Sequence, residues 1–167
     1  MSQTPFHDMT GPEALLEKLH AERADVSADP LSTRHAMNAS LTAWHMTTWV
    51  WKHRIKHNWD YRSQLRLGRG GHGEFVAAVM KQCPELSTME GVSNATKHLA
   101  LEVAVDVAPG PYGPGYSDGF DKGDRLVVTD HYGSNGVPFR GQLKRVVIFW
   151  EDFLEQYPES ETPPGAN

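Results

Sequence analysis

Large hydrophobic residues between Asp29 and His57 follow the pattern of a long amphipathic helix. They recur at alternating spacings of four and three residues, which brings them onto one face of an α-helix. The stripe consists of Met37, Leu41, Trp44, Thr48, Trp51 and Ile55. Asp29-Pro30 supplies a helix cap followed by a proline at the first helical position. We therefore expect one helix from this pair to about His57, with Trp44 and Trp51 in the core.

The same periodicity predicts four shorter helices elsewhere in the chain. Residues 10–13, Thr-Gly-Pro-Glu, read as a capping box that opens a helix ending near Ser27. Residues 74–82 form a short apolar repeat, and Pro84 starts another that continues toward His98. Apolar positions within residues 143–157 mark a closing amphipathic helix. The glycine-rich residues 58–73 break the pattern and are expected to form a loop.

Three stretches in the last third of the chain predict strands. Residues 101–107 alternate with period two, residues 125–130 are a second apolar run, and residues 137–140 return as a short third strand. Residues rich in Gly, Pro, Tyr and Asp separate the first two.

Together these elements predict an α+β fold. We expect a helical bundle of about five helices with a small antiparallel β-sheet near the C-terminal third. Residues 1–157 are expected to form a single globular domain, followed by a disordered tail at residues 158–167.

Composition limits the classes of function. The chain has 167 residues, 39% hydrophobic content and a net charge of −5, which argues against a surface that is basic throughout. No apolar run approaches the roughly 18 residues that span a bilayer, and the first ten residues lack the pattern of a signal peptide. Cys83 is the single cysteine, which excludes an internal disulfide. We therefore expect a cytoplasmic protein without membrane contact.

Two motifs suggest metal or cofactor sites, but their context is unfavourable. His53 and His57 are four residues apart, as on a metalloenzyme helix, yet Arg54 stands where a zincin has its glutamate and further cations oppose a divalent ion. Residues 68–73 satisfy the glycine spacing of a dinucleotide-binding loop, but a helix rather than an apolar strand precedes them. We expect neither a metal nor a cofactor.

A basic segment is the first candidate site. Six of the 16 Lys and Arg residues lie between Lys52 and Arg69, with Asp60 as the only acid among them. Aromatic rings are interleaved with these cations, and single-stranded RNA is bound by this combination of charge and stacking. The predicted contacts are Arg54, Lys56, Arg62, Arg66, Arg69 and Trp59. The alternative is a solvated helix end whose charge balances an acidic domain.

The chain also resembles a group of small bacterial proteins of unknown function over most of residues 30–157. The shared pattern is Ala43-Trp44-His45, Trp49-Val50-Trp51, Cys83-Pro84-Glu85-Leu86, Asn94-x-x-Lys97-His98 and Phe149-Trp150-Glu151-Asp152-Phe153-Leu154. More remotely, a helical Asn with a His four residues later is similar to HEPN domains. Those are helical bundles, often ribonucleases of toxin–antitoxin and phage-defence systems, with an Arg-polar-…-His motif assembled across a dimer.

The HEPN resemblance implies a catalytic site of Asn94, Lys97 and His98. Asn94 would be the polar residue, His98 the catalytic histidine, and Lys97 a nearby cation. Ser93 occupies the position of the family's arginine, so the cation that stabilises the transition state is absent. The structural alternative is that Asn94 and His98, one turn apart, order the junction between a helix and a strand.

Two classes of function follow from these observations. The first is a HEPN-like RNA-interacting factor of bacterial stress or phage defence, with ribonuclease activity that needs no metal if it is an enzyme at all. The second is a non-catalytic interaction module, a homodimer joined through its aromatic helix. The missing arginine favours a protein without catalytic activity, and a metal-dependent enzyme ranks third.

Overall fold

The computed structural model describes residues 10–95, 103–108, 125–130 and 137–159, and side chains for residues 10–94 and 138–159. The helices are α1 (Pro12–Ala28), α2 (Thr33–Val50), α3 (Trp59–Gln64), α4 (His72–Gln82), α5 (Leu86–Ala95) and α6 (Phe139–Gln156), and a π-helical segment, Trp51–Ile55, continues α2. The strands are β1 (Val103–Ala108), β2 (Arg125–Asp130) and β3 (Val137–Pro138).

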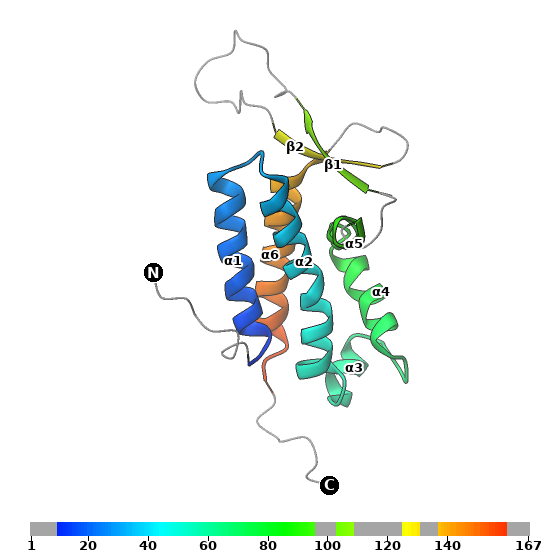
Figure 1. Cartoon of the computed structure of the whole chain (residues 1–167). Coiled ribbons are helices and arrows are strands. Elements are labelled where there is room, and N and C mark those ends of the chain that lie inside the picture. The colour runs from blue at the N-terminus through cyan, green and yellow to red at the C-terminus, as the bar shows by residue number, and fades with distance from the viewer. Residues whose placement is uncertain (1–9, 96–102, 109–124, 131–136, 160–167) are drawn as a thin grey trace.

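The long helices α1, α2 and α6 lie side by side, and α4 and α5 flank α2 on its other side (Figure 1). Helix α1 runs toward the sheet, whereas α2 and α6 run away from it. The strands form an antiparallel sheet of order β1-β2-β3 at one end of the bundle. Helix α3 lies at the opposite end (Figure 1).

The α+β expectation is wrong, because the chain folds as a mainly helical domain. Among residues with described side chains, every core residue comes from a helix or from the chain next to one. The strands have two to six residues and lie at the end of the bundle, so they add no second layer along its length. The helices bury one another's apolar faces, and this removes the need for a sheet as a packing partner.

The core stripe predicted for α2 is displaced around the helix. Met37 is 37% exposed, and Leu41, Trp44 and Thr48 are only partly buried, although Trp51 is buried. Small residues occupy the buried face instead, and they are Ala36, Ala39, Ser40, Ala43 and Thr47 together with Met46 and Val50. Small side chains let the backbone of α2 approach its neighbours closely, and larger residues from those neighbours fill the remaining space.

Helix α6 supplies several of the largest buried side chains. Phe139, Leu143 and Trp150 are fully buried, and the ring of Trp150 packs edge-on against Phe153 with centroids 5.7 Å apart. The β-branched pair Val146-Val147 is also fully buried and stays helical, because core packing outweighs its weak helix propensity.

Several predicted boundaries are wrong. Gly11, without a side-chain hydrogen bond, precedes α1, so the capping box at Thr10 does not form. Ser32 caps α2 instead of Asp29, and it accepts a hydrogen bond from the His35 amide at 3.3 Å. Helix α3 lies within the predicted loop 58–73. The predicted third strand, 137–140, is limited to Val137–Pro138 because α6 starts at Phe139.

The small face of α2 leads to a first prediction. Ala43→Leu should lower the free energy of unfolding by about 1–3 kcal/mol, because a fully buried, closely packed position has no room for three more carbons. The control is Ala77→Leu, the same change at an exposed position of α4, with an expected effect within about 0.5 kcal/mol. Urea unfolding measures both. Equal stability of the two variants would contradict the close packing of α2.

Candidate nucleic-acid interface

The basic segment lies at the end of the bundle opposite the sheet, where α2 changes into a π-helix. The Lys56 amide donates to the Trp51 carbonyl at 2.8 Å, five residues back, which widens the last turn. Trp51, Arg54 and Ile55 face the interior. The side chains between and after them, Lys52, His53, Lys56 and His57, are exposed.

Arg62, expected at the RNA surface, is a buried structural residue of α3. It is 7% exposed, and its guanidinium donates to three backbone carbonyls, those of Lys56 at 3.2 Å, Gly68 at 3.0 Å and Gly70 at 2.6 Å. One side chain thus joins the end of the π-helix to the loop between α3 and α4. Because its donors are directed at the backbone, Arg62 stabilises the segments that carry the surface residues while its own side chain stays buried.

The same guanidinium supports an exposed tryptophan. It lies 4.7 Å from the ring centroid of Trp59 and 5.3 Å from that of Trp51. Trp51 is buried, whereas Trp59 is 65% exposed. Asn58 positions this tryptophan at the first residue of α3, because its Oδ1 accepts from the Tyr61 amide at 3.0 Å and caps the helix. The indole of Trp59 therefore packs against a positively charged guanidinium whose position is fixed, and much of the surface of the indole remains in solvent.

Helix α3 ends in a Schellman motif with an unusual residue. The Leu67 amide donates to the Arg62 carbonyl at 2.9 Å and the Arg66 amide to the Ser63 carbonyl at 3.0 Å. This motif requires a left-handed residue, normally glycine, and here Arg66 adopts it with φ 56°. A side chain at this position costs conformational energy. Arg66 is exposed, so packing does not explain its presence.

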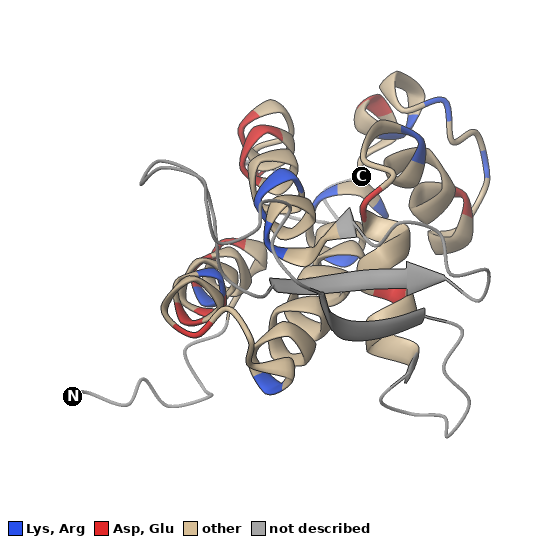
Figure 2. Ribbon diagram, turned by 90° about the horizontal axis from the view of Figure 1, so that it is seen from above, with Lys and Arg blue, Asp and Glu red and all other residues tan. Residues whose placement is uncertain are grey.

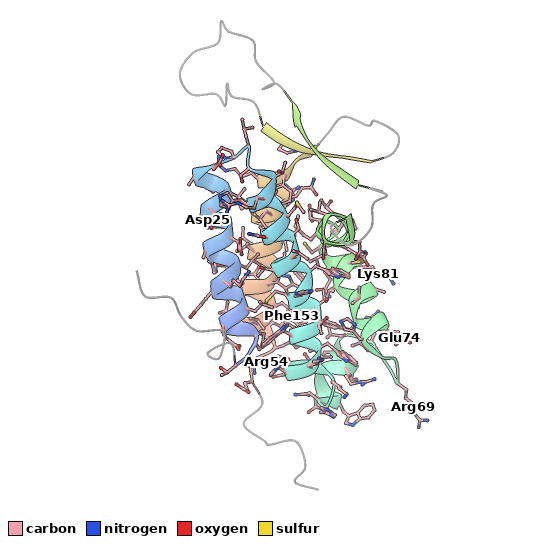
Figure 3. The ribbon with its side chains drawn as sticks, in the orientation of Figure 1. Asp25, Arg54, Arg69, Glu74, Lys81 and Phe153 are labelled. Atoms are coloured by element: carbon pink, nitrogen blue, oxygen red, sulfur yellow. The ribbon has the colours of Figure 1, made fainter. Side chains whose placement is uncertain are left out.

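Four exposed cations surround Trp59 in the sequence and at this end of the fold. They are Lys52, Lys56, Arg66 and Arg69. None has an ion pair among the described residues. In Figure 2, Lys and Arg positions gather over α3 and the loop that follows it, with few acidic positions between them. Arg69 extends from this loop away from the bundle (Figure 3). We call Lys52, Lys56, Trp59, Arg66 and Arg69 the basic–aromatic surface.

Arg54, also expected to contact RNA, is buried and paired with acids. It is 6% exposed and forms an ion pair with Glu13 of α1. Its Nη1 lies 3.3 Å from Glu159, after the end of α6. Arg54 therefore ties the end of α2 to two other parts of the chain.

The histidines near this end differ in their surroundings. His53 stacks on Trp49, with ring centroids 5.4 Å apart and an interplanar angle of 8°. His57 is exposed. No group of three or more His, Cys, Asp or Glu residues in the described part of the chain could hold a metal ion.

The residues suggested by the HEPN resemblance lie elsewhere. Asn94 is exposed near the end of α5, and Ser93 beside it is fully buried. Lys97 and His98 lie outside the described residues. Helix α5 contacts β1 at the sheet end, whereas α3 lies at the other end (Figure 1). The fold does not bring Asn94 together with the basic–aromatic surface.

Cys83 is buried and unreactive. Burial, and then its hydrogen bond to Glu85 at 3.5 Å, raise the pKa of its thiol to about 11. A thiol with this pKa stays protonated at neutral pH, which excludes it as a nucleophile there.

No protein-family model, curated protein or solved structure matches this chain. Among the described residues, no helix is long and apolar enough to cross a membrane.

The three bonds of Arg62 lead to a second prediction. Arg62→Ala should lower the free energy of unfolding by roughly 2–4 kcal/mol, because it leaves partly buried carbonyls without a donor and removes the support of Trp59. Arg62→Lys should recover only part of this, since one ammonium cannot reproduce the planar fork. Arg69→Ala, at an exposed position, should stay within about 0.5 kcal/mol. A similar stability of all three variants in urea unfolding would contradict a structural role for the three hydrogen bonds of Arg62.

The raised pKa of Cys83 leads to a third prediction. Because only the thiolate reacts, iodoacetamide at pH 8 should alkylate the folded protein at least about 100-fold more slowly than the urea-unfolded chain, as expected for a pKa raised from 9.0 to about 11. The rate in the folded protein should climb toward pH 11. Rapid labelling of the folded protein at pH 8 would contradict the burial of the thiol.

Proposed function

We propose that the basic–aromatic surface binds single-stranded RNA. The observation that carries this proposal is the exposed ring of Trp59, held over the buried guanidinium of Arg62. A base stacks on an indole whatever its identity, and such stacking contributes about 1–3 kcal/mol per base. An indole fixed before binding loses little rotational freedom when a base stacks on it.

Phosphate contacts come from the exposed cations around the indole. Lys52, Lys56, Arg66 and Arg69 contribute four positive charges within one end of a chain whose net charge is −5. Local concentration of positive charge against an acidic average favours a bound polyanion at this end.

The conformation of Arg66 gives independent support. Glycine at this position would complete the same Schellman motif without steric cost. An exposed arginine in a conformation that favours glycine is the kind of local strain that is often retained at binding sites. Contact with a phosphate is a role for this side chain, because guanidinium groups bind phosphate oxygens through paired hydrogen bonds.

The proposal concerns binding and does not depend on cleavage. Asn94 lies toward the sheet end of the bundle and is not part of the basic–aromatic surface, and Lys97 and His98 lie outside the described residues. Homodimer formation through the aromatic helix α2 is the competing proposal, and the partly exposed rings of Trp44 and Trp49 would then lie in a protein interface.

Binding of a fluorescent oligouridine, followed by anisotropy, tests the RNA proposal. Affinity should fall with salt, and four phosphate contacts predict a slope of log K against log [salt] near −3, from about −0.7 per contact. Trp59→Ala should weaken binding by about tenfold and Trp59→Phe by less, because phenylalanine still stacks. The control Lys81→Gln, at an exposed position of α4, should have little effect. No binding at low salt, or equal effects of Trp59→Ala and Lys81→Gln, would reject the proposal.

Arg66→Gly separates stability from binding. The substitution should raise the free energy of unfolding by up to about 1 kcal/mol, because glycine adopts the left-handed conformation without strain. It should also weaken RNA binding and reduce the salt slope by about 0.7. A variant that is more stable but binds RNA as tightly as the parent would show that Arg66 has no role in binding.

A dimer would respond differently to these changes. Sedimentation of the parent protein, of Trp44→Ala in the aromatic helix and of Trp59→Ala in α3 distinguishes the two proposals. A parent dimer that dissociates on loss of Trp44 would support the interaction module, whereas an unchanged oligomeric state of Trp59→Ala with lost RNA binding supports the RNA surface.

A further inference from the structure

A second basic site lies at the other end of the bundle. A pocket of about 450 Å³ is lined by residues from the last turns of α1, the start of α6 and the end of β3. The described residues that line it are Arg23, Ser27, Pro138, Arg140, Gly141 and Lys144. This volume falls within the range of about 300–1,000 Å³ that is usual for small-molecule sites.

Three of these six lining residues are cations, and none is an acid. Arg23, Arg140 and Lys144 have no ion pair within the described part of the chain. The nearby acids of α1 are directed elsewhere, because Glu22 pairs with Lys18 at 2.7 Å. The next acid along α1, Asp25, lies 3.9 Å from Nδ1 of His35.

A neighbouring arginine on α6, unlike the cations of the pocket, has an acidic partner. Arg145 pairs with Glu85 at 2.5 Å, across the contact between α6 and the start of α5. Arg23, Arg140 and Lys144, which come from two different helices, instead share one concave site. Three positive charges around a pocket repel one another, and a bound anion would relieve this repulsion.

The backbone adds to the positive field of the pocket. Two lining residues, Arg140 and Gly141, belong to the first turn of α6, where amide groups lack partners within the helix. Pro138 precedes this turn and provides no side-chain cap. Ser27 provides a hydroxyl, which donates to the Arg23 carbonyl at 2.9 Å and keeps its oxygen free to accept.

From this arrangement, we propose that the pocket binds the phosphate group of a small phosphorylated molecule. Two guanidinium groups and one ammonium more than offset the two negative charges of a phosphate dianion, and arginine forms paired hydrogen bonds with its oxygens. The volume of this open pocket suits a small molecule. This site is separate from the basic–aromatic surface, which lies at the opposite end of α2 (Figure 1), and it stands without the RNA proposal.

Calorimetric titration of the full chain with inorganic phosphate, pyrophosphate, adenosine monophosphate and adenosine tests the proposal. The phosphate-bearing probes should bind and adenosine should not. Arg140→Gln, Lys144→Gln and Arg23→Gln should each weaken pyrophosphate binding by about tenfold, as expected for the loss of one charge-assisted contact. Lys144→Arg retains the charge and should bind within about twofold of the parent.

The matched control is Arg145→Gln, which removes the same charge from the same helix but outside the pocket. It should bind pyrophosphate like the parent. Equal weakening by Arg145→Gln and Arg140→Gln would assign the binding to general charge and overturn the proposal, as would the absence of binding by every phosphate probe. Tighter binding of adenosine monophosphate than of inorganic phosphate would identify a phosphate ester as the ligand. The reverse order would identify free phosphate.

Thermal unfolding of each variant separates loss of the site from loss of the fold. Arg140 and Lys144 are exposed, so their variants should unfold at the temperature of the parent in the absence of ligand. Pyrophosphate should raise the unfolding temperature of the parent and of Lys144→Arg, and should raise that of Arg140→Gln by less. A rise of the same size in Arg140→Gln would reject the pocket as the binding site.

Discussion

Close packing of α2 against its neighbours is the constraint on which the rest of the structure depends. The buried face of α2 is built largely from alanine, serine and threonine, so the helices around it approach its backbone. Large side chains of the core then come from α6 and α4, including Trp150 and Phe75. The indole of Trp44 consequently lies beside the buried face of α2 and is only partly buried.

The end of α2 couples this packing to the basic–aromatic surface. Trp51 packs against Phe75 of α4, with ring centroids 5.8 Å apart, and against the guanidinium of Arg62. Arg62 in turn supports Trp59 and holds the loop that carries Arg69. Stability and the proposed RNA contact therefore share one buried arginine, so the surface is organised before any ligand arrives.

Charge is distributed unevenly over an acidic protein. Arg54 and Arg62 serve the fold from buried positions, whereas exposed cations gather at the two ends of the bundle. One group surrounds a protruding indole and suits a chain of stacked bases. The other lines a pocket and suits a single phosphate group. Shape, rather than the number of charges, distinguishes the two proposed ligands.

Helix periodicity in the sequence alone determined that most of the chain before residue 95 is helical and that residues 143–157 form a closing helix. The sequence also located the basic segment and its interleaved rings, because charge and aromatic content are local properties. It did not determine which face of α2 is buried, since small residues and indoles both follow helical spacing. The packing of the neighbouring helices decides which of these two faces is buried.

The sequence also did not distinguish the buried Arg54 and Arg62 from the exposed Lys56, Arg66 and Arg69. Burial of an arginine depends on carbonyls and carboxylates brought in from elsewhere, such as Gly70 and Glu13. The pocket formed by Arg23, Arg140 and Lys144 required residues more than 100 positions apart to meet, and only the tertiary packing of α1 on α6 places them together.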